Sequence, residues 1–196
     1  MPEDTQLSDS DGVFLVKTAR MAVTEFLSNG KRMKLESERE KKFSFNSGVF
    51  VTLNIADGLR GCIGFPMPDK KLSHGIIDAA IAAATEDPRF SPVKINELNN
   101  IVFEVTVLTP PVEITVTDPM EYLEKIKVGR DGLIIRNSFS SGLLLPQVPV
   151  EYGWNVEEFL QHTCEKAGLE KDTWKNEKVK IEKFEGIVYK ERANGS

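Results

Sequence analysis

Apolar residues recur three and four positions apart in three long stretches, the spacing of helix faces that pack on a core. The first stretch follows the cap-forming sequence SDSDG and is expected to end at Asn29-Gly30. Ser73 is expected to cap the second helix, which Asp87-Pro88 ends. Asn155 is expected to cap the third, which Gly168 ends. The chain is therefore predicted to hold three long helices, and the highly charged residues 31–42 form a solvated connector after the first.

Between these helices the apolar residues form runs or alternate with polar ones, as in strands. Two such runs flank Asp57-Gly58, a dipeptide typical of a tight hairpin turn. Residues 101–108 alternate most clearly, with Glu104 and Thr106 on the face opposite Phe103. Further strands are expected at residues 113–116, 132–137, 142–146 and 179–189. This mixture predicts an α+β protein with antiparallel sheets.

Pro110-Pro111 interrupts the chain between two groups of strands and indicates a boundary between subdomains. The last strand is expected to rejoin the first group, because pairing holds a chain end in place. The larger subdomain is therefore predicted to comprise residues 1–111 and 179–196, and the smaller one residues 112–178. Each is expected to be an antiparallel sheet with flanking helices.

Composition and charge narrow the classes of function. The 196 residues carry a formal net charge of −5, which argues against broad nucleic-acid binding. Two widely separated cysteines form no disulfide framework and indicate free thiols in a reducing compartment. The chain has no apolar run of membrane-spanning length, and its acidic first residues do not resemble a signal peptide. A cytoplasmic location is expected.

The stretch LRGCIG, residues 59–64, offers the most specific chemistry. In a strand, Arg60 and Cys62 would point to the same face, and a guanidinium beside a thiol favours the thiolate. Gly61 and Gly64 would leave room for a ligand or for another backbone to approach. Small residues, cysteine included, are also common and inert in buried strands. The stretch is thus either a nucleophile on a strand or a tightly packed strand.

The segment EDPRF, residues 86–90, raises a similar choice. It is either a rigid exit from a helix or a source of polar contacts, with Glu86, Asp87 and Arg89 directed at a ligand. His74 is a weaker candidate for a general base. Cys164 lies on the apolar face of its helix and is expected to be structural. With two histidines and two dispersed cysteines, no metal site is predicted.

The segment LLPQVPVEYGW, residues 144–154, combines two prolines with polar and aromatic side chains. A rigid loop presenting Gln147, Glu151 and Trp154 would suit recognition of a partner. Trp154 could equally serve packing.

Five motifs now occur in order: LRGCIG, DPRF (87–90), GRDGLII (129–135), GLLLPQV (142–148) and EYGW (151–154). Together they resemble the AMMECR family, in its archaeal or bacterial form, over residues 12–190. The resemblance implies two α+β subdomains, with the LRGCIG strand facing a cleft between them. It supplies no reaction. Similar bacterial domains are associated with a Memo-like protein and a radical-S-adenosylmethionine protein, which hints at a redox or modification pathway.

Two hypotheses follow. In the first, the protein is an enzyme: Cys62 acts in the cleft as a nucleophile or redox thiol on a protein or other large substrate, Arg60 favours its thiolate, and Glu86 or Asp87 assists proton transfer. In the second, it is a binding module without catalysis. A protein or peptide then lies in the cleft against Arg60, Arg89 and the segment from Gln147 to Trp154. Neither hypothesis requires a cofactor, and both leave the substrate and the oligomeric state open.

Overall fold

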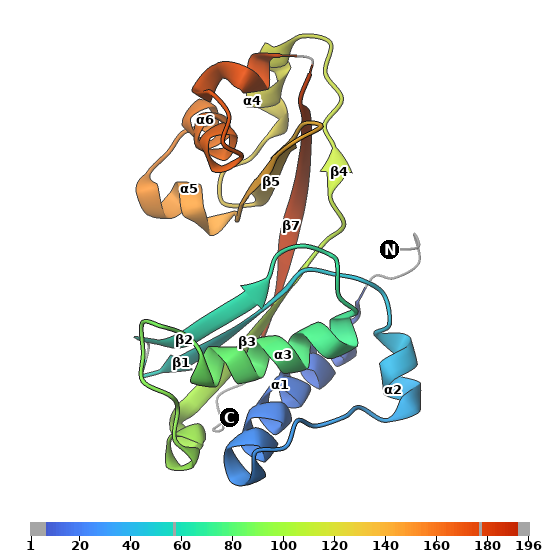
Figure 1. Ribbon diagram of the computed structural model, residues 1–196, viewed down its shortest axis with the longest axis vertical. Coiled ribbons are helices and arrows are strands. Elements are labelled where there is room, and N and C mark those ends of the chain that lie inside the picture. The colour runs from blue at the N-terminus through green and yellow to red at the C-terminus, as the bar shows by residue number, and fades with distance from the viewer. Residues whose placement is uncertain (1–6, 57, 177, 192–196) are drawn as a thin grey trace. The chain divides into compact units, whose positions relative to one another are not determined.

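The computed structural model describes residues 7–56, 58–176 and 178–191 (Figure 1). The chain divides into two compact units, each described here by itself. Unit 1 comprises the chain up to Leu108 together with the segment from Ile187 onward, and unit 2 comprises Thr109–Gly186.

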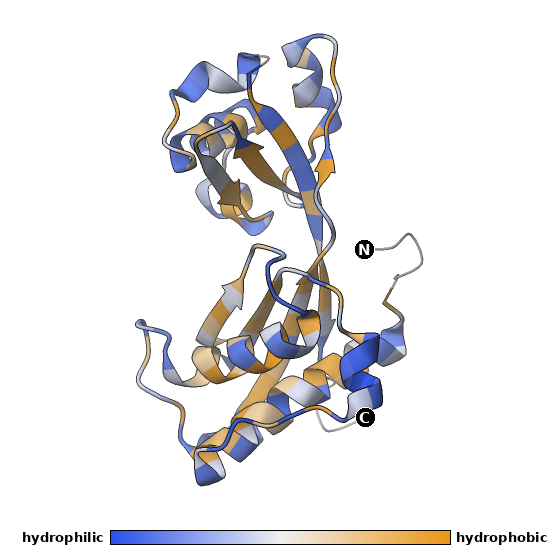
Figure 2. Ribbon diagram, turned by 45° about the vertical axis from the view of Figure 1, so that its right-hand side comes forward, coloured by the Kyte–Doolittle hydropathy of each residue, from blue (hydrophilic) through white to orange (hydrophobic). Residues whose placement is uncertain are grey.

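Unit 1 consists of an antiparallel sheet with helices on one face (Figure 1). In the sheet, β1 lies between β2 and β3, and the end of the last strand follows β3. The strands are mostly hydrophobic, whereas α2 is mostly hydrophilic (Figure 2). The elements are α1 (Asp9–Asn29), α2 (Ser37–Lys42), β1 (Val49–Ile55), β2 (Gly58–Phe65), α3 (Leu72–Thr85), η1 (Ile95–Asn100) and β3 (Ile101–Leu108).

The core of unit 1 lies between this sheet and helices α1 and α3. On β1, Val49, Val51 and Leu53 are fully buried, while the alternate residues Phe50 and Thr52 are half-buried. The same alternation holds on β3. One face of the sheet is therefore sealed by the helices, and the other bears the half-buried side chains.

Unit 2 is built on a second antiparallel arrangement, in which β7 lies between β4 and β5, and β5 pairs with β6. Its core contains Phe159, Leu160, Cys164 and Trp174. The elements are β4 (Val112–Glu113), η2 (Pro119–Glu121), α4 (Tyr122–Lys125), β5 (Asp131–Arg136), β6 (Ser141–Leu144), α5 (Gln147–Tyr152), α6 (Val156–Lys166), η3 (Lys171–Lys175) and β7 (Lys180–Lys190).

The α+β class is confirmed, with two differences in arrangement. The described strands join into one seven-stranded sheet rather than two separate ones, because β7 is long enough to pair with β5 and then follow β3. The segment from Gln147 is a short helix closed by Gly153, whose φ is 68°, rather than an extended loop. The predicted tight turn includes residue 57, which lies outside the described residues.

Two further expectations about helices need correction. Ser73 does not cap α3. The helix already begins at Leu72, and its N-cap is Lys71. The connector 31–42 is not entirely solvated, because Met33 and Leu35 pack against the core and its last six residues form α2. The caps at Asn155 and Gly30 are confirmed, with Gly30 at a φ of 70°.

Candidate functional site

The LRGCIG stretch forms β2, which lies at the edge of the sheet and contains a bulge. Cys62 pairs with Thr52 and Gly61 with Leu53, but the next residue of β1, Asn54, pairs with Leu59. Arg60 is therefore the extra residue of the bulge. The predicted alternation, with Arg60 and Cys62 on one face, was wrong because the bulge displaces it by one residue.

Arg60 is held by a carboxylate rather than placed beside the thiol. Its Nε and Nη2 atoms donate to the two carboxylate oxygens of Glu97, at 3.0 and 3.2 Å. Its Nη1 atom donates to the carbonyl of Ser91 at 3.0 Å. These contacts also lower the pKa of Glu97, chiefly through the hydrogen bond from Arg60. Arg60 thus joins the bulge to the segment that includes η1, and the prediction that it favours the Cys62 thiolate finds no contact to support it.

Asp87 is the buried acidic partner of the Cys62 backbone. Its carboxylate accepts a hydrogen bond from the Cys62 N–H at 2.8 Å and two from the Arg89 guanidinium, at 3.0 and 2.8 Å. The hydrogen bonds from the Arg89 side chain, joined by those from the backbone of Cys62 and Arg89, hold the pKa of Asp87 far below its usual range. A carboxylate so fully engaged is a weak proton acceptor, which argues against Asp87 in proton transfer.

Arg89 completes the contact with the strand. Its Nη2 atom donates to the Cys62 carbonyl at 3.3 Å, while Asp87 holds the N–H of the same residue. The two side chains therefore bind both backbone groups that Cys62 would otherwise offer to a neighbouring strand. We call this pair the Asp87–Arg89 clamp. The guanidinium near Cys62 is thus that of Arg89. The pKa of Arg89 is raised, mainly by its hydrogen bonds to Asp87 and to the smallest extent by the charge of Cys62.

Cys62 is half-buried and lies on the face of β2 opposite to that of Gly61, which packs against α3. Its Sγ atom lies 3.2 Å from the Oγ1 atom of Thr52, directly across the strand pair. Glu104 on β3 pairs with Thr52 from the other side. Cys62, Thr52 and Glu104 therefore form a polar row across three strands.

The two glycines of the motif admit neighbouring protein atoms. For Gly61 this confirms the predicted alternative of a close approach by another backbone. A Cβ atom on Gly61 would lie 2.1 Å from the carbonyl oxygen of Ala83 in α3. One on Gly64 would lie 2.3 Å from the ring of Phe50. The first glycine admits a helix backbone and the second an aromatic ring, so protein atoms already occupy both spaces.

Other candidates of unit 1 are not brought to the thiol by any hydrogen bond among the described residues. Glu86 is exposed at the C-cap of α3, next to Asp87 in the chain. His74 is exposed at the other end of that helix and lies 3.2 Å from a carboxylate oxygen of Glu40. The described part of the structure therefore gives Cys62 no histidine base.

The remaining predicted residues lie in unit 2. Gln147 and Glu151 are exposed on α5. The indole of Trp154 stacks on the ring of Tyr152, with centroids 4.9 Å apart, and on His162, at 3.9 Å. His162 also lies 2.7 Å from a carboxylate oxygen of Glu165. His162 is not predicted as a site residue from the sequence, because helical periodicity places it away from the core and its partner Trp154 precedes the helix.

Two general features are absent from the described residues. No group of three or more histidine, cysteine, aspartate or glutamate side chains is arranged to hold a metal ion in those parts of the chain. No described helix is both long and apolar enough to cross a membrane.

The comparisons with known proteins agree with one another. The AMMECR1 family model matches residues 16–189. Protein MJ0810 of Methanocaldococcus jannaschii is 52% identical over 187 residues, which cover 94% of this chain and 92% of that protein. Protein PYRAB00100 of Pyrococcus abyssi is 49% identical over 191 residues, which cover 95% and 93%.

A solved structure matches as well. The crystal structure of the uncharacterized protein PH0010 from Pyrococcus horikoshii is 49% identical in sequence and superposes with a TM-score of 0.77. The match covers 95% of this chain and 94% of that one. The LRGCIG strand, the Asp87–Arg89 clamp and the sheet that carries them all fall within the matched residues, and the chain belongs to the AMMECR1 family.

Proposed function

We propose that the protein is an enzyme in which Cys62 is the reactive group and Arg89 is the cation that favours its thiolate. One observation carries this proposal. The Asp87–Arg89 clamp fixes both backbone groups of Cys62, while its thiol remains half-buried rather than sealed in the core. A fixed backbone beneath an accessible thiol is the arrangement that a nucleophile requires.

Charge and hydrogen bonding both support this role. The thiolate is the nucleophilic form of cysteine, and a nearby guanidinium favours it. The hydroxyl of Thr52, 3.2 Å from Sγ, can donate a hydrogen bond to the thiolate, which favours the charged form further. Asp87 opposes this effect through its negative charge, but Arg89 neutralises it at close range. Whether the charges around Cys62 favour a thiolate therefore depends on Arg89.

The reaction this arrangement suits is attack by the thiolate on an electrophilic atom of a protein or other large substrate. A bond forms between Sγ and that atom, and the bond to the leaving group breaks with its electron pair. The carboxylate of Asp87 is already occupied by hydrogen bonds. Of the two predicted carboxylates that follow α3, Glu86 is therefore the one left for proton transfer. In this scheme Asp87 is a positioning residue, whereas Arg60 binds Glu97 and Ser91 and makes no contact with Cys62.

The test is the pH dependence of Cys62 alkylation by iodoacetamide, followed by mass spectrometry in a Cys164→Ala background. This substitution removes the second of the two cysteines, so all labelling reports on Cys62. We expect Arg89→Gln to move the midpoint of the alkylation profile to higher pH, because it removes the guanidinium that binds the Cys62 carbonyl.

The matched control is Arg60→Gln, which removes the other arginine near the motif but leaves the guanidinium of the clamp in place. It should leave the alkylation midpoint unchanged. A midpoint that Arg89→Gln leaves in place, or that Arg60→Gln moves as far, would reject the proposed role of Arg89 at Cys62.

A second function, protein binding, is favoured by the stacked aromatic residues of unit 2. Tyr152 is 69% exposed although it stacks on Trp154, so the stack presents a rigid aromatic surface to solvent. Exposed aromatic groups with their rotamers fixed are typical anchors of protein interfaces. Gln147 and Glu151, on the same short helix as Tyr152, would add polar contacts. The partner suggested by family association is a Memo-like or radical-S-adenosylmethionine protein.

Calorimetric titration with a purified Memo-like protein tests this function. Trp154→Ala should weaken binding at least tenfold, because it removes the middle ring of the stack. Cys62→Ser should leave the affinity unchanged. Phe139→Ala is the control, because Phe139 is 96% exposed and is not one of the stacked rings. Equal effects of Trp154→Ala and Phe139→Ala would reject the stack as an anchor.

A further inference from the structure

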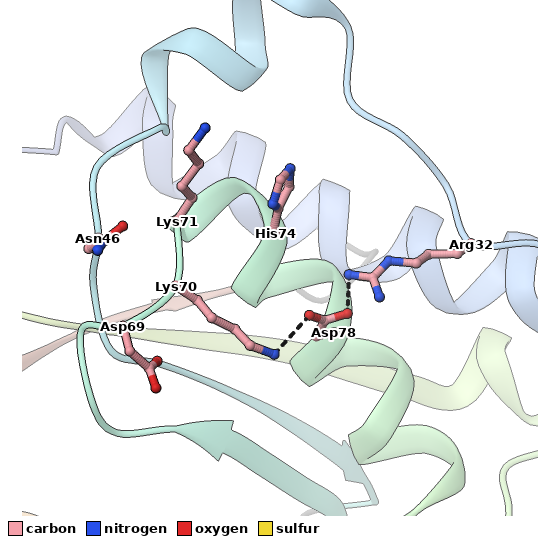
Figure 3. A pocket seen from close by; sticks show the side chains of 7 residues that line it. All are labelled: Arg32, Asn46, Asp69, Lys70, Lys71, His74 and Asp78. Atoms are coloured by element: carbon pink, nitrogen blue, oxygen red, sulfur yellow. Dashed lines mark hydrogen bonds and ion pairs between the residues drawn. The ribbon is translucent and has the colours of Figure 1, made fainter.

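A charged hollow opens beside the first turns of α3 in unit 1 (Figure 3). Its volume is about 420 Å³. The side chains of Arg32 and Lys70 converge on Asp78, with Lys70 Nζ 3.1 Å from a carboxylate oxygen (Figure 3). Lys71 and Asp69 also line the hollow, so three basic side chains face two acidic ones. This excess of positive charge contrasts with the chain as a whole, whose net charge is −5.

A second hollow of about 500 Å³ shares Arg32 and His74 with the first. Part of its wall is apolar and consists of Met33, Leu35 and Ile77. The first two come from the connector after α1, and the third from α3. The two hollows therefore adjoin, and they differ in character: one is charged, and the other has an apolar wall.

Ser73 lines the second hollow and carries a buried hydroxyl that has no hydrogen-bond partner among the described residues. The side chain is fully buried, and such groups in folded proteins are nearly always paired. The helix end itself does not explain it, because the N–H groups of Leu72 and Ser73 donate to Phe45 and Phe43, each at 2.9 Å. The hydroxyl therefore has unused hydrogen-bonding capacity at the wall of the second hollow.

We propose that the two hollows form one binding site for a small amphipathic monoanion, a carboxylate with a short aliphatic chain. The carboxylate lies where the hollows meet, near Arg32 and the Ser73 hydroxyl. The aliphatic chain lies along Met33, Leu35 and Ile77. A single negative charge fits best. The four basic side chains of the two hollows, Arg32, Lys34, Lys70 and Lys71, are offset by three acidic ones, Glu40, Asp69 and Asp78. This site is independent of the chemistry proposed for Cys62.

Octanoate is the probe, and calorimetry together with amide chemical shifts of the full chain is the measurement. We expect saturable binding at least tenfold tighter than that of acetate, which lacks the chain, and of 1-octanol, which lacks the charge. The largest shifts should fall on residues 32–35 and 72–78. Saturable binding with shifts elsewhere, or equal affinity for octanoate and 1-octanol, would overturn the proposal.

Two variants connect the binding to the named groups. Arg32→Gln should weaken octanoate binding at least fivefold, and Ser73→Ala about threefold. Ser73→Ala should not lower the thermal midpoint of the free protein, because the hydroxyl it removes has no partner. A loss of binding in this variant therefore cannot be attributed to unfolding. The control is Arg39→Gln on α2, whose guanidinium lies over the ring of Phe14. Unchanged binding in both Arg32→Gln and Ser73→Ala would refute the site.

Discussion

Replacing Gly61 with alanine should destabilise the protein by about 3 kcal/mol, at the upper end of the usual cost of overpacking. The new methyl group would lie 2.1 Å from the carbonyl oxygen of Ala83 and 3.2 Å from its carbonyl carbon. Both atoms belong to the backbone of α3, so no side-chain rotation can relieve the overlap. Strand and helix would have to separate, and the core between them would lose contacts.

The matched control is Gly58→Ala at the start of the same strand. A Cβ atom there would lie 3.5 Å from its nearest neighbour, the carbonyl oxygen of Ile55, which is ordinary contact. Urea unfolding of the two variants measures the difference in free energy of unfolding. If both glycines tolerate alanine equally, α3 does not pack on β2 as closely as the structure has it.

Much of the fold could be predicted from the sequence, because its signals are local. The spacing of apolar residues identified α1, α3 and α6, and the caps at Gly30 and Asn155 lie where their residue types are favoured. The cap at Ser73 failed because the first N–H groups of α3 find backbone carbonyls of residues 43 and 45 instead. That pairing depends on how a preceding segment folds back, which no local pattern encodes.

The arrangement of the strands was harder to predict for the same reason. Pairing partners lie far apart in the chain, and the period of two does not identify them. The length of β7, Lys180–Lys190, allows one strand to serve both ends of the sheet. The sequence has strand character there and favours a return to the first strands, but it does not indicate the pairing with β5.

At the candidate site, the contacts between distant parts of the chain could not be predicted from the sequence. The motifs LRGCIG and DPRF were both chosen from the sequence, yet their connection through Asp87 and the Cys62 backbone was not. The bulge at Arg60 decided which arginine approaches the cysteine. A bulge depends on the register between two strands, which the sequence does not show. Strict alternation therefore predicted Arg60 as the arginine beside Cys62, whereas in the structure that arginine is Arg89.

Asp87→Asn should lower the free energy of unfolding at neutral pH by about 2 to 3 kcal/mol, the range for a buried hydrogen-bonding group that carries a charge. The amide oxygen can still accept one hydrogen bond, but it cannot match the bidentate contact with Arg89. The exposed fraction of the Asp87 side chain is only 2%, so water cannot replace the lost contacts. The clamp would then release the backbone of Cys62. The rate of Cys62 alkylation should therefore change together with the free energy of unfolding.

The pH dependence of the loss in free energy of unfolding shows whether Asp87→Asn acts by removing a charge or by changing the shape of the hydrogen-bonding group. The pKa of Asp87 is lowered in the folded state, so its contribution to stability is fully present above the unfolded value of about 3.9. That contribution is lost as the pH falls through the lower, folded value. The difference between wild type and Asp87→Asn should therefore be constant above about pH 5 and shrink by up to about 1.4 kcal/mol per pH unit below pH 4.

Glu86→Gln provides the control for this titration, because it removes an adjacent but exposed carboxylate. Its stability should parallel that of the wild type from pH 7 to pH 3, within about 0.5 kcal/mol. Urea unfolding at each pH gives all three curves. A difference between wild type and Asp87→Asn that stays constant down to pH 3 would mean that the Asp87 charge contributes nothing. The clamp would then act through shape alone, and the argument for a charged environment at Cys62 would fail with it.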